Sequence, residues 1–252
     1  MKVHPGMEVA GLTDVGCQRE DNEDSYAYWE AGDDPTFARL GRLAIVADGM
    51  GGCEGGQFAS RIAVDSVQES YSSAQAGDPQ QLLLDAVRSA NFRVQEKARA
   101  TPSLRGMGTT LTAAAIVGSR LYFAHVGDSR LYLLHNGALR ALTRDHTLVA
   151  RLVETGVIRS EDADSHPQKH VLTAAVGVAE DVTPDAPEAG IALEKGDVLL
   201  LCTDGLWGQM THAEIAGVLS PNKPEAAAHA LVELAKDRGG PDNITVQVLR
   251  MS

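Results

Sequence analysis

Four aspartates stand in glycine-containing turns beside apolar segments of the chain: Asp48, Asp128, Asp204 and Asp242. One such aspartate usually serves its own turn, because its carboxylate accepts hydrogen bonds from nearby backbone N–H groups. Four of them at one rim of a sheet would instead form a site rich in oxygen ligands, which Mg²⁺ and Mn²⁺ prefer. Clustered carboxylates repel one another without a cation. The pattern therefore predicts a site for divalent metal ions.

Other motifs carry weaker signals. The polar run REDNEDSY (19–26) adds carboxylates beside an arginine, and by itself it is typical of a solvated loop or a helix start. The glycines of GMGGCEGG (49–56) are spaced GxGxxxG rather than GxGxxG, and Asp48 before them would repel a pyrophosphate. The segment RGMGTT (105–110) lacks the lysine of a Walker loop. Nucleotide binding is therefore not predicted.

Histidine and cysteine do not indicate a zinc site. The eight histidines show no HxH or HExxH spacing, and the three cysteines form no CxxC pair. Cys17, Cys53 and Cys202 all lie near the acidic motifs. They are interpreted as small buried apolar residues, with oxidative or soft-metal inhibition through Cys17 or Cys53 as the alternative.

The composition limits the function classes. The 252 residues include 22 Lys and Arg against 34 Asp and Glu, which gives a formal net charge of −12 and disfavours nucleic acid and anionic membranes as partners. Hydrophobic residues make up 44%, enough for a globular core. No apolar run is long enough to span a membrane, and the start has no signal-peptide core. With the cysteine pattern, this predicts a reduced, cytoplasmic protein.

The elements that must position these carboxylates are short strands joined by tight turns and two separated pairs of helices. No segment has the composition of a linker, so one domain is expected, and antiparallel hairpins favour an α+β fold over a doubly wound one. Strands are predicted at 7–13, 43–47, 109–117, 121–126, 131–134, 197–202 and 244–249, and helices at 57–71, 79–100, 147–154, 211–219 and 225–237. The stretch 31–36 is predicted as a Gly/Asp/Pro loop.

Taken together, the motifs resemble those of the metal-dependent serine/threonine protein phosphatases, the PPM or type 2C family. They follow the family's order over almost the whole chain: TDVGCQREDNEDSY (13–26), AIVADGMGG (44–52), GTTL (108–111), HVGDSRLY (125–132), LCTDGLWG (201–208) and GGPDNITV (239–246). The resemblance implies one phosphatase domain over 7–250, built as a four-layer α/β/β/α sandwich with two central antiparallel sheets flanked by helix pairs.

The resemblance also implies roles for individual residues. Asp48 would bridge two Mn²⁺ or Mg²⁺ ions, the Gly49 carbonyl would complete one of them, and Asp204 and Asp242 would hold the other. Asp128 matches a third, weaker metal position.

Four further residues complete this implied set. Glu23 and Asp24 match an acidic pair that orders metal-bound waters, and Arg19 matches the residue that holds the substrate phosphate. Asn243 would fix the loop that carries the ligands.

The implied activity is hydrolysis of phosphoserine and phosphothreonine by a water or hydroxide that bridges the two ions, in opposition to serine/threonine kinases. The expected partners are phosphorylated proteins and a kinase system, not nucleic acid or membrane. Two alternatives stay open: an inactive pseudophosphatase that only binds phosphoproteins, and a regulatory phosphatase devoted to one partner.

The chain departs from the family pattern at two positions. Met50 stands where many eukaryotic members carry histidine, and this DGMGG form resembles the bacterial branch. A helix and a flap-like segment are expected over about 145–172, followed by Ala174 where arginine is common, which puts substrate engagement in doubt. His166 and His170 in that segment are interpreted as ordinary loop residues, with flap residues near the mouth of the site as the alternative.

Overall fold

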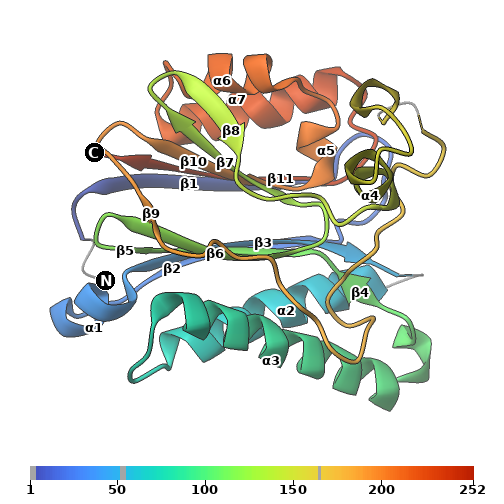
Figure 1. Ribbon diagram of the computed structural model, residues 1–252, viewed down its shortest axis with the longest axis horizontal. Helices are drawn as coiled ribbons and strands as arrows, with labels where there is room; N and C mark the ends of the chain where they lie inside the picture. Colours follow the sequence, from blue (N-terminus) through green and yellow to red (C-terminus); the bar gives the residue numbers. More distant parts are fainter. Residues whose placement is uncertain (1–3, 52–54, 164–165) are drawn as a thin grey trace.

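The computed structural model describes residues 4–51, 55–163 and 166–252, and two antiparallel sheets form its centre (Figure 1). The first sheet has the order β1 (Met7–Asp14), β11 (Ile244–Met251), β10 (Val198–Cys202), β7 (Arg130–His135) and β8 (Ala138–Ala141). The second has the order β2 (Asp24–Glu30), β3 (Arg42–Met50), β5 (Leu111–Val117), β6 (Arg120–Val126) and β9 (Ile191–Ala192), and β4 (Gly108–Thr109) pairs with the end of β3.

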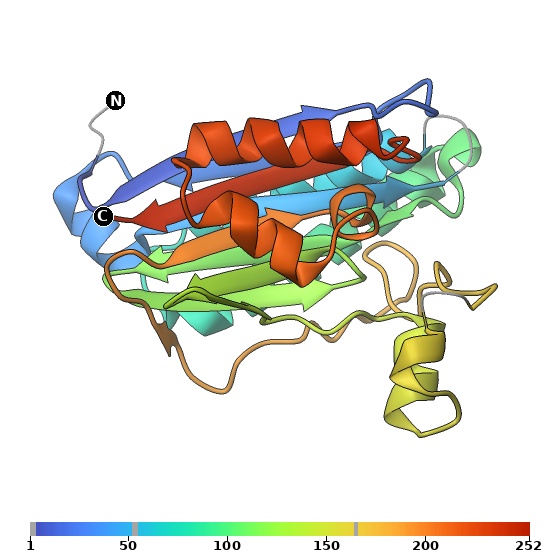
Figure 2. The same ribbon diagram turned by 90° about the horizontal axis from the view of Figure 1, so that it is seen from above.

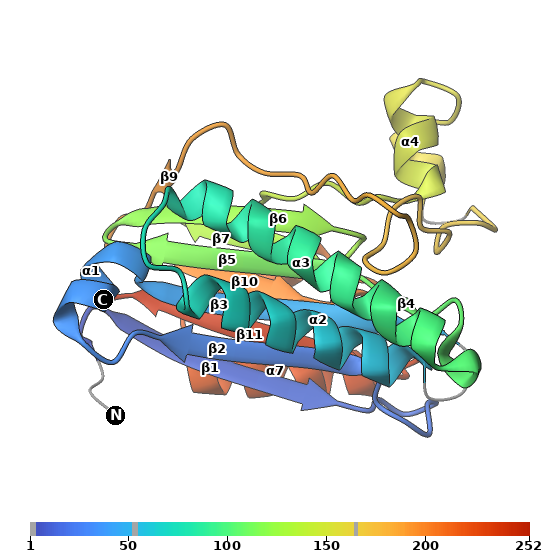
Figure 3. The same ribbon diagram turned by 90° about the horizontal axis from the view of Figure 1, so that it is seen from below.

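Helices cover the outer face of each sheet. Figure 2 shows α6 (His212–Leu219) and α7 (Pro224–Asp237) on the first sheet, and Figure 3 shows α2 (Gly55–Ser72) and α3 (Pro79–Ala100) across the second. The predicted α/β/β/α layering is thus confirmed. Three short helices lie outside the layers: α1 (Asp34–Leu40), α4 (Leu148–Glu154), which stands away from the body, and α5 (Asp204–Trp207).

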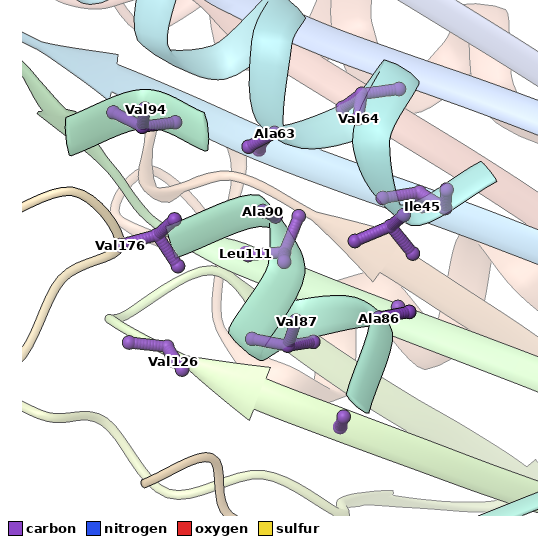
Figure 4. Close-up of a cluster of buried hydrophobic side chains, with 14 of the residues drawn as sticks. Ile45, Ala63, Val64, Ala86, Val87, Ala90, Val94, Leu111, Val126 and Val176 are labelled. Atoms are coloured by element: carbon purple, nitrogen blue, oxygen red, sulfur yellow. The ribbon is translucent and has the colours of Figure 1, made fainter. Parts of the chain in front are cut away.

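Three apolar clusters hold the four layers together. Alternate residues of β3 serve two of them: Ile45 faces α2 and α3, whereas Val46 faces the other sheet. In β10, Leu200 packs under α6 and α7, and Leu201 packs between the sheets. Figure 4 shows the cluster beneath α2 and α3, where small residues such as Ala90 allow the helices to approach the strands. Because both faces of β3 and of β10 are buried, the sequence of each strand is a continuous run of apolar residues.

Local signals determine several element boundaries. The Asp78 side chain accepts hydrogen bonds from the N–H groups of Gln80 and Gln81 and so caps α3, as its sequence predicts. Asn136 and Gly137 both have positive φ, 49° and 80°, as expected for the tight turn between β7 and β8.

Tertiary contacts overrode the sequence pattern in three places. The polar run is a loop over 19–23, as predicted, but its end from Asp24 onward belongs to the edge strand β2, which pairs with β3 from Asp24 to Glu30. The predicted loop at 31–36 instead begins α1, which Asp33 caps. The strand predicted at 109–117 is divided into β4 and β5, because Thr110 bonds to Asp48 across the sheet. No helix among the described residues is long and apolar enough to cross a membrane.

We expect Leu201→Ala to lower the free energy of unfolding by about 3 kcal/mol, because it leaves a cavity between the sheets. Leu201 is fully buried, whereas Val157 is 66% exposed. Val157→Ala is therefore the matched control, with an expected change within about 0.5 kcal/mol. Urea denaturation of both variants measures the difference, and equal effects would contradict the packing described here.

Candidate metal centre

Strand register brings the acidic residues to one end of the two sheets. Asp24 at the start of β2 is directly opposite Asp48 near the end of β3. Asp204 follows β10 at the first turn of α5, and Asp242 precedes β11, the antiparallel neighbour of β10. Asp128 lies in the turn between β6 and β7. Strand ends of both sheets therefore deliver the carboxylates predicted from the sequence to one region.

Mutual repulsion and burial dominate the electrostatics of this region. Burial, together with the charges of Asp204 and Asp242, raises the pKa of Asp24 to about 7. Burial and the neighbouring Asp204 and Asp145 raise the pKa of Asp128 to about 7. The pKa of Asp48 is well above its usual value, because burial and the carboxylates of Asp24 and Asp204 oppose its ionisation. The region therefore favours any ligand that brings positive charge.

Threonine hydroxyls connect the two halves of the cluster, and the sequence analysis missed them. Thr203 Oγ1 donates to Asp24 Oδ2 at 2.8 Å and accepts the Thr245 N–H at 3.0 Å. Thr203 is fully buried and directly precedes Asp204. Thr203 therefore links the Asp24 carboxylate on one sheet to the segment of the other sheet that carries Asp204. The position of Thr203 beside Asp204 in the motif LCTDGLWG was the only sequence signal for this role.

The backbone at Asp48 is held by the GTT segment before β5. The Asp48 N–H donates to Thr110 Oγ1 at 2.9 Å, and the Asp48 carbonyl accepts from the Thr110 N–H and from Thr109 Oγ1. At Gly49 a Cβ would lie 2.1 Å from the Gly56 carbonyl oxygen. Only glycine fits there, so the DG step reflects close packing of β3 against the start of α2.

Asn243 organises the loop that carries the polar run. Its Oδ1 accepts the Glu23 N–H at 2.8 Å, and its Nδ2 donates to the carbonyls of Val15 and Asp21. The Glu23 carboxylate lies close to the Gly56 backbone, where a Cβ would come within 2.5 Å of Oε1. These contacts agree with a loop-fixing function for Asn243, and they place Glu23 beside the start of α2.

Arg19 pairs with a predicted metal ligand in this structure. Its Nη2 donates to Asp242 Oδ2 at 2.7 Å, and the guanidinium is half exposed. The ion pair with Asp242 is electrostatically favourable for an arginine beside a carboxylate cluster. Among the described residues, its other N–H groups have no hydrogen-bond partner. Phosphate binding by Arg19 stays a prediction.

The flap-like segment borders the centre through one histidine. His170 Nδ1 lies 3.7 Å from Asp204 Oδ2, and this contact raises the pKa of His170. His170 is therefore not an ordinary loop residue, whereas all the hydrogen bonds of His166 to described residues stay within the loop, including that from the Gln168 N–H to its ring Nδ1. Ala174 packs against the core cluster under α2 and α3. A residue at this position lies beside the core rather than in the flap.

The cysteines divide between two environments. Cys202 in β10 is fully buried, and burial raises its pKa, as expected for a small apolar residue. Cys17 differs from the expectation of burial because it is exposed, with its Sγ 3.8 Å from the Lys236 carbonyl. Cys53 lies outside the described residues.

The donor set suits hard divalent cations. One buried carboxylate oxygen of Asp24 and one of Asp204 have no hydrogen-bond partner in the described part of the chain. Within that same part, no three aspartate, glutamate, histidine or cysteine side chains are grouped so that they could hold a metal ion as they stand. The residues thus fit cations through their chemistry and charge, with oxygen atoms left free to bind them.

Several known proteins are similar to this chain in sequence and fold. A family model described as "Protein phosphatase 2C" matches residues 18–234. Protein phosphatase PhpP of Streptococcus pneumoniae is 34% identical over 251 residues, 98% of each chain. Serine/threonine protein phosphatase PstP of Mycobacterium tuberculosis is 39% identical over 96% of this chain and 44% of its own length. The structure of a PstP catalytic domain in complex with two manganese ions is 36% identical, with a TM-score of 0.84 over 97% of this chain and 98% of that one.

The raised pKa values predict how the metal-free protein responds to pH. Unfolded Asp24 and Asp128 lose their protons near pH 4, whereas the folded protein keeps them until about pH 7. Between these values the folded state binds more protons, so stability falls as the pH rises. We expect chelator-treated protein to melt at a lower temperature at pH 8 than at pH 5.5, by on the order of 5 °C.

The variant Asp128→Asn isolates this effect, because it removes one of the titrating groups. Its melting temperature should depend less on pH than that of the wild type, whereas Asp65→Asn, at an exposed position, should leave the dependence unchanged. Thermal melts in chelator at pH 5.5 and pH 8 measure the pH dependence of each variant's melting temperature. A steeper dependence in Asp128→Asn would contradict the assignment.

Proposed function

The chain belongs to the protein phosphatase 2C family, and we propose that it is a metal-dependent phosphatase that hydrolyses phosphoserine and phosphothreonine in proteins. The observation that carries the proposal is the group of mutually repelling carboxylates from both sheets, centred on Asp48. Such a group is costly in a folded protein unless cations neutralise it. Named relatives that are serine/threonine phosphatases over nearly the whole length of the chain support the same activity.

Two Mn²⁺ or Mg²⁺ ions are the proposed cofactors. Asp48, the Gly49 carbonyl, Asp204 and Asp242 would hold them. When bound, such ions lower the pKa of a water molecule that attacks phosphorus and neutralise the charge that develops on the phosphoryl oxygens.

Glu23 and Asp24 are proposed to order water around the ions, and Asp128 to provide a weaker third position. The Asp24 carboxylate is already oriented by Thr203, which leaves its second oxygen free for this purpose.

Substrate orientation is assigned to Arg19. Its guanidinium can bind two phosphate oxygens at once, and the half-exposed side chain can reach a phosphate without leaving the neighbourhood of Asp242. Since bound ions would activate a water molecule as the attacking group, no serine or cysteine nucleophile is needed, and no phosphoenzyme is expected. Asn243 keeps the Glu23 backbone and the Asp242 loop in one arrangement during the reaction.

The biological setting is proposed at the level of its chemistry. The enzyme would act on phosphoproteins in the cytoplasm and reverse the action of serine/threonine kinases. An inactive phosphoprotein-binding protein is the main alternative, and the full set of carboxylates disfavours it. A phosphatase dedicated to one partner would use the same centre.

The test is a Mn²⁺ titration of the hydrolysis of p-nitrophenyl phosphate and of a phosphothreonine peptide. We expect wild-type activity to require the metal, and both Asp48→Asn and Asp204→Asn to lower kcat by at least about 100-fold, because loss of a ligand weakens metal binding and removes charge stabilisation. Calorimetry of Mn²⁺ binding gives a second readout that does not depend on turnover.

Asp65→Asn serves as the control, since Asp65 is exposed on α2 and has only an ion pair with Arg61. It should keep full activity and metal affinity. Wild-type protein that binds the phosphopeptide but does not hydrolyse it with Mn²⁺ would support the pseudophosphatase alternative. Full activity of Asp48→Asn would contradict the proposed centre.

A further inference from the structure

An open surface groove with a volume of about 460 Å³ lies at the C-terminal end of α3, outside the carboxylate cluster, and three of its four lining residues are exposed. The described residues that line it are Ala98, Arg99, Arg105 and Gly106. Two of these four are arginines, and none is acidic. In a chain with a net charge of −12, such a local concentration of positive charge is a candidate for binding anions.

The two arginines lack the carboxylate partners that most arginines of this protein have. Arg130 pairs with Asp145, and Arg238 pairs with Glu214. In contrast, Arg99 donates only to the neutral Gln95 Oε1 at 3.1 Å, and within the described part of the chain the Arg105 side chain makes no hydrogen bond or ion pair. Their guanidinium groups therefore keep donors free for a carboxylate or a phosphate.

The groove lies on the chain segment just before β4, which pairs with the strand that carries Asp48. Gly108 in β4 is opposite Met50, the second residue after Asp48, and Figure 3 shows β4 beside the end of α3. The backbone of Met107 packs against Gly51, where a Cβ would lie 3.2 Å from its Cα. Arg105 is three residues before Gly108, so its Cα lies at most about 15 Å from that of Met50, given ~3.5 Å per extended residue and ~5 Å between strands. An extended peptide covers this distance in about three to five residues.

We propose that Arg99 and Arg105 form a subsite for an anionic group of the phosphoprotein substrate, three to five residues from the phosphorylated residue that is hydrolysed. The subsite rests on the proposed phosphatase function and adds a sequence preference to it. Its ligand is a carboxylate side chain or a second phosphate, both of which fit the planar guanidinium fork. The negative charge of the rest of the molecule makes this preference more selective, because an acidic segment is repelled elsewhere.

The experiment compares phosphothreonine peptides that differ at one position only, the fourth residue before or after the phosphothreonine. This residue is glutamate, glutamine or a second phosphothreonine. Wild type is compared with Arg99→Gln, Arg105→Gln and the double variant. We expect KM for the anionic peptides to be lower than for the glutamine peptide, and each substitution to raise it about two- to fivefold, the range of an exposed ion pair. The glutamine peptide and p-nitrophenyl phosphate should be unaffected.

Arg88→Gln is the matched control, because Arg88 is exposed on the same helix but pairs with Asp85. A preference for glutamate identifies an acidic side chain as the ligand, and a preference for the doubly phosphorylated peptide alone identifies a second phosphate. Equal KM values for all three peptides, or a preference that persists in the double variant, overturns the subsite.

Failure of this proposal can be distinguished from failure of the phosphatase proposal. Hydrolysis of p-nitrophenyl phosphate without any peptide preference overturns the subsite alone. If the wild type hydrolyses neither p-nitrophenyl phosphate nor any of the peptides, the catalytic proposal is overturned. Fluorescence anisotropy of peptide binding then still tests the subsite. In that measurement, the anionic peptides must bind more tightly than the glutamine peptide to wild type but not to the double variant.

Discussion

Repulsion between carboxylates that the fold holds close together is the constraint on which this structure depends. Antiparallel pairing of β2 with β3 places Asp24 directly opposite Asp48, an arrangement that destabilises a sheet when both side chains are charged. The other sheet adds Asp204 and Asp242 to the same region. Partial protonation, the Arg19 ion pair and the Thr203 hydrogen bond each reduce the cost, and bound cations would reduce it further. The carboxylates that cost stability are also the ones proposed to bind the ions.

The position of the cluster between two sheets connects the hydrophobic core with the chemistry. Each sheet supplies part of the proposed ligand set, so the separation of the sheets decides how far apart the carboxylates are. Aliphatic side chains such as Val46 and Leu201 fill the space between the sheets and determine that separation. Thr203 closes the same interface at its polar end. A change in inter-sheet packing should therefore reach the metal centre without any direct contact with a ligand.

Charge distribution gives the proposed substrate specificity a physical basis. The molecule is acidic as a whole, yet a phosphoprotein brings negative charge to the very end of the sheets where carboxylates gather. Cations at the centre and the Arg19 guanidinium would attract the reacting phosphate. In the proposed subsite, Arg99 and Arg105 at the end of α3 would attract neighbouring residues of the substrate. Attraction limited to these places would select for the arrangement of charges along the substrate rather than for its total charge.

Local patterns in the sequence determined most of the strands and helices, because Asp78 caps its helix and Asn136-Gly137 turns its hairpin with residues a few positions away. The same patterns indicated which aspartates end strands. Tertiary structure alone decided that the end of the polar run, from Asp24, enters β2, since its pairing with β3 and the Thr203 bond to Asp24 come from residues far along the chain. It also decided that His170 contacts Asp204 and that two arginines share one groove. Spacing within a segment encodes its conformation, whereas contacts between segments depend on register and packing that no single segment contains.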